Sequence, residues 1–305
     1  MQLQPDPVLD EVGTAFELVR DKGLVAVSED RIASAAARAI GSGDPATVRS
    51  KADLMAALAV ATGREGSDPR ILAGVAIDAM VAETGYPGGY IDIDAVLRAA
   101  EQPQGHENRS PGLAVRREGD VAIVTFARFE RDSRKTVNAL AKEPPVATAR
   151  AVVLDLRGNT GGPLSTAVEI ADLFLDQGEI VRLCGRQAGD CERQFAQKGD
   201  VAGGRPIAVL IDGKVGGGAE ILAAALRDHG RARIVGETSF GNGVIRTLLQ
   251  LSRRSALSLT TAQAFRPSGA PIQGTGVTPD VMVPATADGA DGALAAAITL
   301  LGGGA

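Results

Sequence analysis

Aromatic residues and long apolar runs are scarce in this 305-residue chain. It has no Trp and two Tyr, and aromatic residues make up 3% of the sequence. No apolar run approaches the roughly 18 residues that a membrane-spanning helix needs, since the longest candidate, Ala293–Leu301, stops at a run of Gly. Hydrophobic residues nevertheless make up 45% of the chain and charged residues 23%, which is typical of folded globular proteins. We expect no membrane span, and a core built from Ala, Val, Leu and Ile.

Cysteine and histidine are rare as well, with two of each, and their spacing is unlike that of a zinc site. We therefore expect no metal and no cofactor. The formal net charge is −5 and the pI is about 5.3, which argues against a nucleic-acid partner because domains that bind nucleic acid are usually basic. The N-terminus shows no basic region followed by an apolar stretch. It leaves open a cytoplasmic protein or one whose signal peptide has been removed.

Residues 1–100 predict an α-helical region. Apolar residues recur there at helical spacing, and we expect helices over Val8–Val19, Arg31–Ile40, Ala52–Thr62, Arg70–Thr84 and Ala95–Ala100. The Gly-rich stretch 85–90 predicts a loop. Residues 101–117 are predicted to hold a linker, polar and aperiodic over Glu101–Pro111, and a strand that leads into the next domain.

Residues 118–285 predict a layered α/β core, because strand, turn and helix recur in that order. Continuous apolar runs at Ala151–Leu156 and Pro206–Ile211 indicate strands that are buried on both faces. Further strands are expected over Val121–Phe126, Ile180–Cys184, Cys191–Phe195, Arg233–Val235, Val244–Leu251 and Ala256–Thr261, and helices over Arg134–Leu140, Leu164–Leu175 and Ala219–Arg227. Residues 286–305 are expected to form a C-terminal helix or tail.

A Gly-rich turn follows each of the two buried strands, Asn159–Gly162 after the first and Gly216–Gly218 after the second. In open α/β folds, ligands bind beyond the carboxyl ends of strands, where such turns lead into helices. Backbone N–H groups at these turns can hold a carboxylate or a developing oxyanion, and glycine lets a ligand approach the backbone closely. Taken singly, each glycine motif is better explained as a tight packing turn.

In five segments the sequence resembles the C-terminal-processing (tail-specific) serine proteases. The stretch Leu-Asp-Leu-Arg-Gly-Asn-Thr-Gly-Gly within Val153–Leu175 is similar to the family's Leu-Asp-Leu-Arg-x-Asn-x-Gly-Gly region, and Arg205–Ile221 resembles its nucleophile turn. Arg227–Gly243 resembles the lysine-bearing segment, Leu257–Asp280 the C-terminal signature and Ile71–Leu97 an N-terminal helical segment. The resemblance implies a ClpP/crotonase-like α/β core, a peptide or protein as the partner, and a periplasmic or otherwise extracytoplasmic location.

The chain departs from the family at both positions that carry its chemistry. The family's serine nucleophile lies three positions before the Glu that opens a helix; that residue is Glu220 here, so the nucleophile position is Gly217. The family's general-base lysine lies between the two glycines of Phe-Gly-Lys-Gly, where this chain has Asn242. An amide does not take up a proton near neutral pH and cannot activate a hydroxyl. We therefore expect a catalytically inactive homologue, a pseudoprotease.

Other positions of the family's site are kept. By resemblance, the oxyanion donors are the amide of Gly218 and that of Gly161 or Gly162, so we expect a site that holds a peptide without cutting it. Asp228 occupies the family's auxiliary acidic position and is expected to be an ordinary helix-end carboxylate. Three nearby residues, Lys214, Ser239 and His229, were considered as substitutes for the missing nucleophile and base. We expect Lys214 and Ser239 to be solvated loop residues, and His229 to have a capping or packing role.

Cys184 and Cys191 lack a nearby motif His and do not suggest a nucleophile. Their spacing places them opposite each other in a hairpin if Gln187-Ala188 form a two-residue loop, and a pair across a non-hydrogen-bonded site is close enough for a disulfide. A disulfide and two reduced thiols are both compatible with the sequence. A disulfide favours an extracytoplasmic location.

Typical members of the family carry a PDZ domain between their N-terminal helices and the catalytic core. Here only a short linker separates Ala100 from Leu113. We therefore expect no PDZ domain at this point, and no gating of the usual kind by substrate.

Three functions remain open at this stage. The leading one is a non-catalytic binding or scaffold protein, whose N-terminal helices mediate self-association or the docking of a partner. The second is a hydrolase with a relocated nucleophile or a water-mediated mechanism. The third is a binder of small apolar ligands, because a retinoid-binding branch resembles this fold without being proteolytic.

Overall fold

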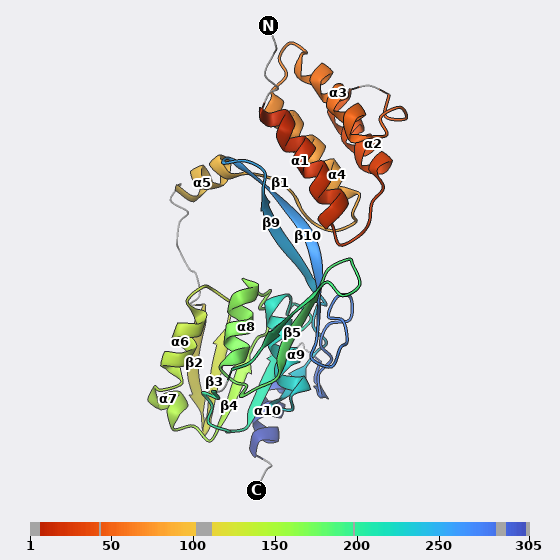
Figure 1. Ribbon diagram of the computed structural model, residues 1–305. Helices are drawn as coiled ribbons and strands as arrows, with labels where there is room; N and C mark the ends of the chain where they lie inside the picture. Colours follow the sequence, from red (N-terminus) through yellow and green to blue (C-terminus); the bar gives the residue numbers. More distant parts are fainter. Residues whose placement is uncertain (1–6, 43, 102–111, 198, 285–290, 303–305) are drawn as a thin grey trace. The chain divides into compact units, whose positions relative to one another are not determined.

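The computed structural model describes residues 7–42, 44–101, 112–197, 199–284 and 291–302. Within these residues the chain forms two compact units (Figure 1). The first comprises Met1–His106 together with Gly185–Asp190 and Ile245–Ala262. The second comprises Glu107–Cys184, Cys191–Val244 and Gln263–Ala305. Most of the predicted linker, residues 102–111, lies outside the described residues.

Four helices dominate the first unit. Their apolar faces enclose one core, in which Phe16, Ile77 and Met80 are fully buried. Two of the helix starts are capped: Ser50 and Asp53 form a capping box, and Asp68 accepts a hydrogen bond from the backbone of Arg70. The helices are α1 (Pro7–Lys22), α2 (Glu29–Ile40), α3 (Lys51–Thr62) and α4 (Pro69–Ala82). The helical prediction for this region is therefore confirmed in element type.

Strands complete the first unit, for which the sequence predicted helices only. β1 (Gly89–Asp92) begins within the stretch expected as a loop, pairs with the first part of β10 (Ser255–Phe265) and is followed by α5 (Ile93–Glu101). β9 (Val244–Gln250) pairs with β10 in turn. Leu257 and Leu259 of β10 are buried in the helical core. Residues 245–262, which we expected in the α/β core, therefore group with the helices.

A six-stranded sheet forms the centre of the second unit, in the order β11-β8-β7-β4-β3-β2. All neighbours are parallel except β2 and β3. The two central strands, β4 and β7, are buried along their whole length, because helices cover both faces of the sheet. The strands are β2 (Leu113–Glu118), β3 (Val121–Phe126), β4 (Ala151–Asp155), β7 (Ile207–Ile211), β8 (Ala232–Gly236) and β11 (Val281–Met282).

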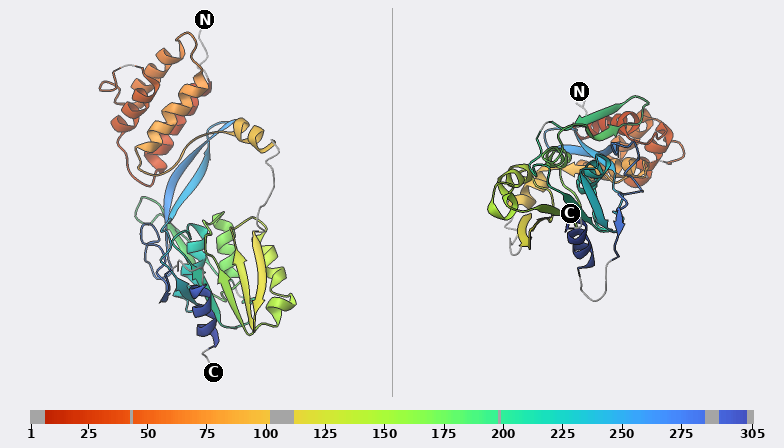
Figure 2. Two further views of the ribbon diagram at one scale, coloured as in Figure 1. Left: turned by 180° about the vertical axis from the view of Figure 1, so that it is seen from behind. Right: turned by 90° about the horizontal axis from the view of Figure 1, so that it is seen from below.

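Helices lie on both faces of this sheet, as the two opposite views in Figures 1 and 2 show. Val153 and Leu210 face α10 (Gly292–Gly302), the helix predicted for the C-terminal tail. Val152 and Leu154 face the opposite side, where Val137 of α6 lies. The other helices are α6 (Ser133–Leu140), α7 (Pro144–Ala147), α8 (Leu164–Asp172) and α9 (Gly218–Asp228). The predicted layered α/β core is confirmed.

A hairpin of β5 (Glu179–Cys184) and β6 (Cys191–Phe195) stands beside this sheet and pairs with the last residues of β10. Cys184 and Cys191 face each other in register and form a disulfide. The turn differs from the predicted one. Asp190 donates its backbone N–H to the carbonyl of Gln187 at 3.0 Å, so Ala188 and Gly189 occupy the centre of the turn. Gly189 has φ 89°, a conformation that favours glycine.

Within the described residues, none of the helices has the length and apolar character needed to cross a bilayer.

The cysteine pairing gives a direct chemical test. We expect thiol titration of the protein, unfolded without reductant, to detect no free thiol, because both cysteines are joined in the disulfide. After reduction, the same titration should detect two thiols. Finding two thiols before reduction would contradict the pairing.

Candidate functional site

The turns after β4 and β7 meet at one edge of the sheet. β4 and β7 are parallel neighbours, so their carboxyl ends lie side by side. Two hydrogen bonds then join the turns: Gly216 donates its backbone N–H to the carbonyl of Asn159 at 3.0 Å, and Gly158 donates to the Asp212 carboxylate at 3.1 Å. A Cβ atom on Gly161 would lie 2.8 Å from the backbone nitrogen of Gly218. The two turns are in contact only because glycine is present there.

Asn159 fixes the shape of the first turn. Its side chain is fully buried; its Nδ2 donates to the carbonyl of Phe126 at 3.0 Å, and its Oδ1 accepts from the N–H of Gly161 at 2.8 Å. The N–H of Gly161 is therefore already engaged. Of the glycines that the resemblance offered as donors, Gly161 shapes the turn rather than presenting its amide.

Gly162 and Gly218 present backbone amides that have no hydrogen-bond partner among the described residues. Gly218 is the first residue of α9, where an N–H has no acceptor within the helix. A Cβ on Gly218 would lie 2.9 Å from the Cβ of Ala167. These two glycines bring donors from both turns to the same part of the molecule.

Gly217, the family's nucleophile position, lies beside Asn242, the family's base position. Gly217 has φ 56° and ψ −124°, a conformation that strongly favours glycine. A Cβ built on Gly217 would lie 3.3 Å from the carbonyl oxygen of Thr160 and 4.0 Å from the Nδ2 of Asn242. The structure therefore brings together the two positions that the resemblance assigned to one dyad.

Glu220 connects the segments that carry these two positions. Its carboxylate is fully buried and accepts four hydrogen bonds: from the Oγ of Ser239 at 2.5 Å and from the backbone N–H groups of Gly241 at 2.7 Å, Asn242 at 2.8 Å and Gly217 at 3.0 Å. Burial raises the pKa of Glu220 above its ordinary value, and the four hydrogen bonds offset only part of that effect. This single side chain fixes the distance between the nucleophile and base positions.

In the sequence, Glu220 served only to locate the nucleophile position, and its four hydrogen bonds were not predicted. The signal for one of them is present, since an acidic residue three positions into a helix often accepts from the N–H of the residue that precedes the helix. The bonds to Ser239, Gly241 and Asn242 come from a segment about twenty residues further along the chain, and no local pattern predicts them.

The expectation for Ser239 was wrong. Ser239 is 7% exposed. Its hydroxyl donates a hydrogen bond to Glu220 and accepts one from the backbone N–H of Val277 at 2.7 Å. Ser239 is a buried structural group rather than a solvated loop residue. Both hydrogen-bonding roles of its hydroxyl are already in use.

Asp228 is the last residue of α9, as expected, but it is not an ordinary helix-end carboxylate. Its side chain is buried, pairs with the guanidinium of Arg266 and accepts from the N–H of Ser268 at 3.0 Å. Burial acts to raise the pKa of Asp228, but its hydrogen bonds to Arg266 and Ser268 outweigh burial and hold the pKa below the ordinary value. Asp228 therefore anchors the turn that follows β10.

His229 and Lys214 lie where the sequence placed them. The ring Nε2 of His229 bonds to the carbonyl of Glu179 at 2.7 Å, which is a packing role at the end of α9. Lys214 is an exposed residue of the turn after β7. In the part of the chain that the structure describes, His, Cys, Asp and Glu side chains form no cluster that is able to hold a metal ion.

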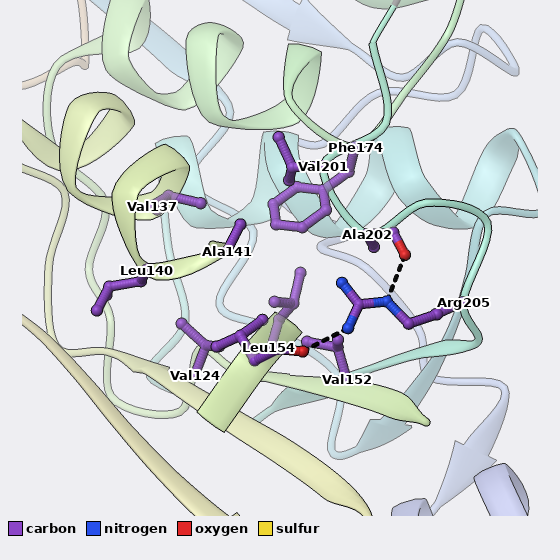
Figure 3. A pocket seen from close by; sticks show the side chains of 11 residues that line it. Val124, Val137, Leu140, Ala141, Val152, Leu154, Phe174, Val201, Ala202 and Arg205 are labelled. Atoms are coloured by element: carbon purple, nitrogen blue, oxygen red, sulfur yellow. Dashed lines mark hydrogen bonds between the residues drawn. The ribbon is translucent and has the colours of Figure 1, made fainter. Parts of the chain in front are cut away.

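A small apolar cavity lies under α6, away from the two turns (Figure 3). Its volume is about 20 Å³, and Val137, Leu154 and Phe174 are among its lining residues. Arg205 closes one side by donating to the carbonyls of Ala202 and Ala149. Sites for small ligands are usually several hundred Å³ in volume, so this cavity gives no support to the apolar-ligand alternative.

The role of Glu220 can be tested by unfolding. Replacing Glu220→Ala leaves the four donors without an acceptor in a buried place, and each such group costs about 1–3 kcal/mol. We expect the free energy of unfolding to fall by at least about 3 kcal/mol, measured with urea. Glu65→Ala, at an exposed position, is the matched control and should change it by less than about 0.5 kcal/mol. Equal, small effects of both changes would contradict the assigned role.

Known proteins resemble this chain in sequence and in fold. A carboxy-terminal-processing protease of Bartonella bacilliformis is 41% identical over 170 residues, which are 54% of this chain and 39% of that protein. The chain thus spans well under half the length of this relative. Two solved structures share the fold: a photosystem II D1 C-terminal processing protease (TM-score 0.62, 18% identity, covering 85% of this chain and 94% of that one) and a lipoprotein from Streptococcus agalactiae (TM-score 0.69, 15% identity, covering 99% of both).

The profile of peptidase family S41 matches residues 120–283, which is more than half of the chain and includes both turns, Glu220 and the segment with Asn242. The predicted similarity to the tail-specific proteases is thereby confirmed. The chain belongs to peptidase family S41.

Proposed function

We propose that this protein is a non-catalytic member of peptidase family S41 that binds peptide or protein chains. One observation carries the proposal: Gly217 and Asn242 lie next to each other at the positions of the nucleophile and the base, and neither is able to perform that chemistry. Glycine has no side chain to attack a carbonyl, and a neutral amide does not accept the proton of a hydroxyl.

A relocated nucleophile finds little support near this site. Ser239 is the serine closest in sequence to the base position, but its hydroxyl is buried and bonded to Glu220. Thr160 is exposed, yet it has no side-chain hydrogen bond to a base among the described residues. Activation of a hydroxyl requires an adjacent base within hydrogen-bond reach. A hydrolase with a relocated nucleophile is therefore less well supported than a non-catalytic binding protein.

The donors that remain suit a bound chain. The amides of Gly162 and Gly218 have no partner among the described residues, so they are available to the carbonyl of a peptide. Phe240, two residues before Asn242, is 71% exposed and offers an apolar surface for a side chain of the peptide. Contacts of this modest extent correspond to dissociation constants on the order of micromolar to millimolar.

Two further proposals concern regulation and location. α5 ends at Glu101 and β2 begins at Leu113, and the residues between them are too few for a PDZ domain, so we propose that no such domain gates the site from this point. We also propose an extracytoplasmic location, because disulfides such as Cys184–Cys191 persist in oxidising compartments.

Self-association through the first unit is proposed from its exposed apolar residues. Ile71 and Val75 lie one turn apart on α4, at 65% and 40% exposure, and Val60 on α3 is 63% exposed. Residues four positions apart share one face of a helix. Exposed apolar patches of this kind are typical of association surfaces.

The proposed lack of catalysis can be tested by restoring the two missing catalytic residues. We expect the wild-type protein neither to cleave unfolded protein substrates nor to react with a fluorophosphonate probe, since loss of members of a catalytic unit costs about 10⁴–10⁶ in rate. The double variant Gly217→Ser with Asn242→Lys should become labelled, because Glu220 still holds the two positions together. Each single variant is the matched control and should stay unlabelled.

Cleavage by the wild-type protein that is lost when one serine is replaced would overturn this proposal. Ser239→Ala is the first replacement to examine. Circular dichroism of each variant shows whether it has folded, which is needed because a serine at position 217 must adopt φ 56°.

Light scattering tests the association surface. We expect a particle mass above the 31.2 kDa of one chain, and a shift toward that value in Ile71→Glu, because a charge on an apolar contact face opposes its burial. Met282→Glu, an equivalent change at an exposed residue of the second unit, should leave the mass unchanged. A wild-type protein that is monomeric at all concentrations would contradict the proposal.

A further inference from the structure

We propose that the first unit holds a separate binding site, which takes a free amino acid through both of its charged groups. The site is a pocket of about 660 Å³, called here the first-unit pocket. Residues of α1, α4 and β1 and of the turn between β9 and β10 line it, and all of them belong to the first unit. Its volume is in the range of several hundred Å³ that is usual for small-molecule sites. The inference does not depend on the proposed function, since the pocket shares no residue with the two glycine turns.

Glu11 of α1 is the most buried charged residue of the first-unit pocket, at 9% exposure. Among the residues that the structure describes, its carboxylate accepts one hydrogen bond, from the hydroxyl of Tyr90 at 3.4 Å. Hydrogen bonds between such groups are usually about 2.5–3.0 Å long. A buried carboxylate is stable only when it is paired or well hydrogen-bonded. Glu11 therefore has acceptor capacity left, which an ammonium group of a ligand would satisfy with charge as well as with hydrogen bonds.

Tyr90 of β1 supports this role of Glu11. Burial is the main cause that raises the pKa of Tyr90 above its ordinary value, and the negative charge of Glu11 adds to it. The phenol therefore keeps its proton at neutral pH and serves Glu11 as a neutral donor. It leaves the negative charge of the carboxylate uncompensated.

Two guanidinium groups of the first-unit pocket have no acceptor among the described residues. Arg70 lies in the first turn of α4 and Arg253 in the turn between β9 and β10, and both are exposed. The third arginine of the pocket, Arg254, pairs with Asp94 at 3.1 Å. Guanidinium groups suit carboxylates in particular, because their N–H groups are able to form two parallel hydrogen bonds to the two oxygens. A carboxylate of a ligand thus has donors at Arg70 and Arg253.

Charges of both signs line the first-unit pocket in equal number. The acidic side chains are Glu11, Asp68 and Asp92, and the basic ones are Arg70, Arg253 and Arg254. A ligand that is only an anion meets the three carboxylates, and one that is only a cation meets the three guanidinium groups; like charges repel. In the part of the chain that the structure describes, acidic side chains form no cluster that is able to hold a metal ion. A small zwitterion matches both signs.

Burial sets the direction in which the zwitterion lies. The carboxylate of Glu11 is buried, whereas Arg70 and Arg253 are exposed, so negative charge lies deep in the pocket and free positive charge nearer to solvent. The α-ammonium group therefore points inward to Glu11 and the α-carboxylate outward to the arginines. The rest of the pocket is left for the side chain of the amino acid.

Calorimetric titration of the full-length protein tests the inference. Each of the twenty amino acids is titrated by itself, and we expect at least one to bind with a dissociation constant between about 1 μM and 1 mM. The tightest one is then compared with its N-acetyl derivative, which keeps only the carboxylate, and with its methyl ester, which keeps only the ammonium group. Each derivative loses one set of charge-assisted hydrogen bonds, so each should bind at least about ten-fold more weakly.

Two variants assign the two ends of the ligand. Glu11→Gln should weaken the amino acid and its methyl ester by at least about ten-fold and leave the N-acetyl derivative unchanged. Arg253→Gln should weaken the amino acid and the N-acetyl derivative and leave the methyl ester unchanged. The matched controls are Asp10→Asn on α1 and Arg246→Gln on β9, at exposed positions outside the pocket, and neither should alter any affinity. Circular dichroism checks folding, and Arg253 is exposed, so its variant keeps the test valid if Glu11→Gln unfolds the protein.

Several results would overturn the inference. They are the failure of all twenty amino acids to bind, a methyl ester that binds as tightly as the amino acid, and an N-acetyl derivative that does so. The ester result would indicate a site for organic cations, and the N-acetyl result a site for anions. Binding that neither Glu11→Gln nor Arg253→Gln weakens would place the amino acid elsewhere, which also overturns it. Each of these results leaves the proposed function standing, because that proposal concerns Gly217 and Asn242.

Discussion

The buried carboxylate of Glu220 is the constraint on which the site depends. It accepts from Gly217 at the start of α9 and from Ser239, Gly241 and Asn242, which lie about twenty residues further along the chain. A buried carboxylate is stable in a protein only when its oxygens are satisfied, so the four donors cannot move independently of it. The nucleophile and base positions consequently stay adjacent, although neither residue contributes catalytic chemistry.

Glycine gives the second constraint, which acts on the backbone. β4 and β7 deliver their turns to the same edge of the sheet, and the turns touch at Gly161 and Gly218, where a Cβ would come within 2.8 Å of a backbone atom and 2.9 Å of a neighbouring side chain. Asn159 then holds the first turn from inside through Phe126 and Gly161. In this arrangement the backbone amides of Gly162 and Gly218 have no hydrogen-bond partner among the residues that the structure describes.

Patterns within a short stretch of sequence predicted much of the fold, and contacts between distant segments account for what was missed. The strand Val121–Phe126 follows from its run of apolar residues, and the helices of the first unit follow from the helical spacing of theirs. β1 does not, because it exists through pairing with β10, far along the chain. Ser239 and Asp228 look like ordinary surface residues in the sequence, since their burial depends on partners that no local motif identifies.

The substitutions at positions 217 and 242 alter side-chain chemistry and leave the framework in place. Both residues still donate their backbone N–H groups to Glu220, so the bonds that hold the two positions together need neither a serine nor a lysine. The family's catalytic dyad and the pair Gly217 and Asn242 differ by two side chains on one backbone. The fold is therefore compatible with either activity, and function has to be assigned from the residues at these positions. Those residues are glycine and asparagine, and it is on their chemistry that the proposal of binding without cleavage rests.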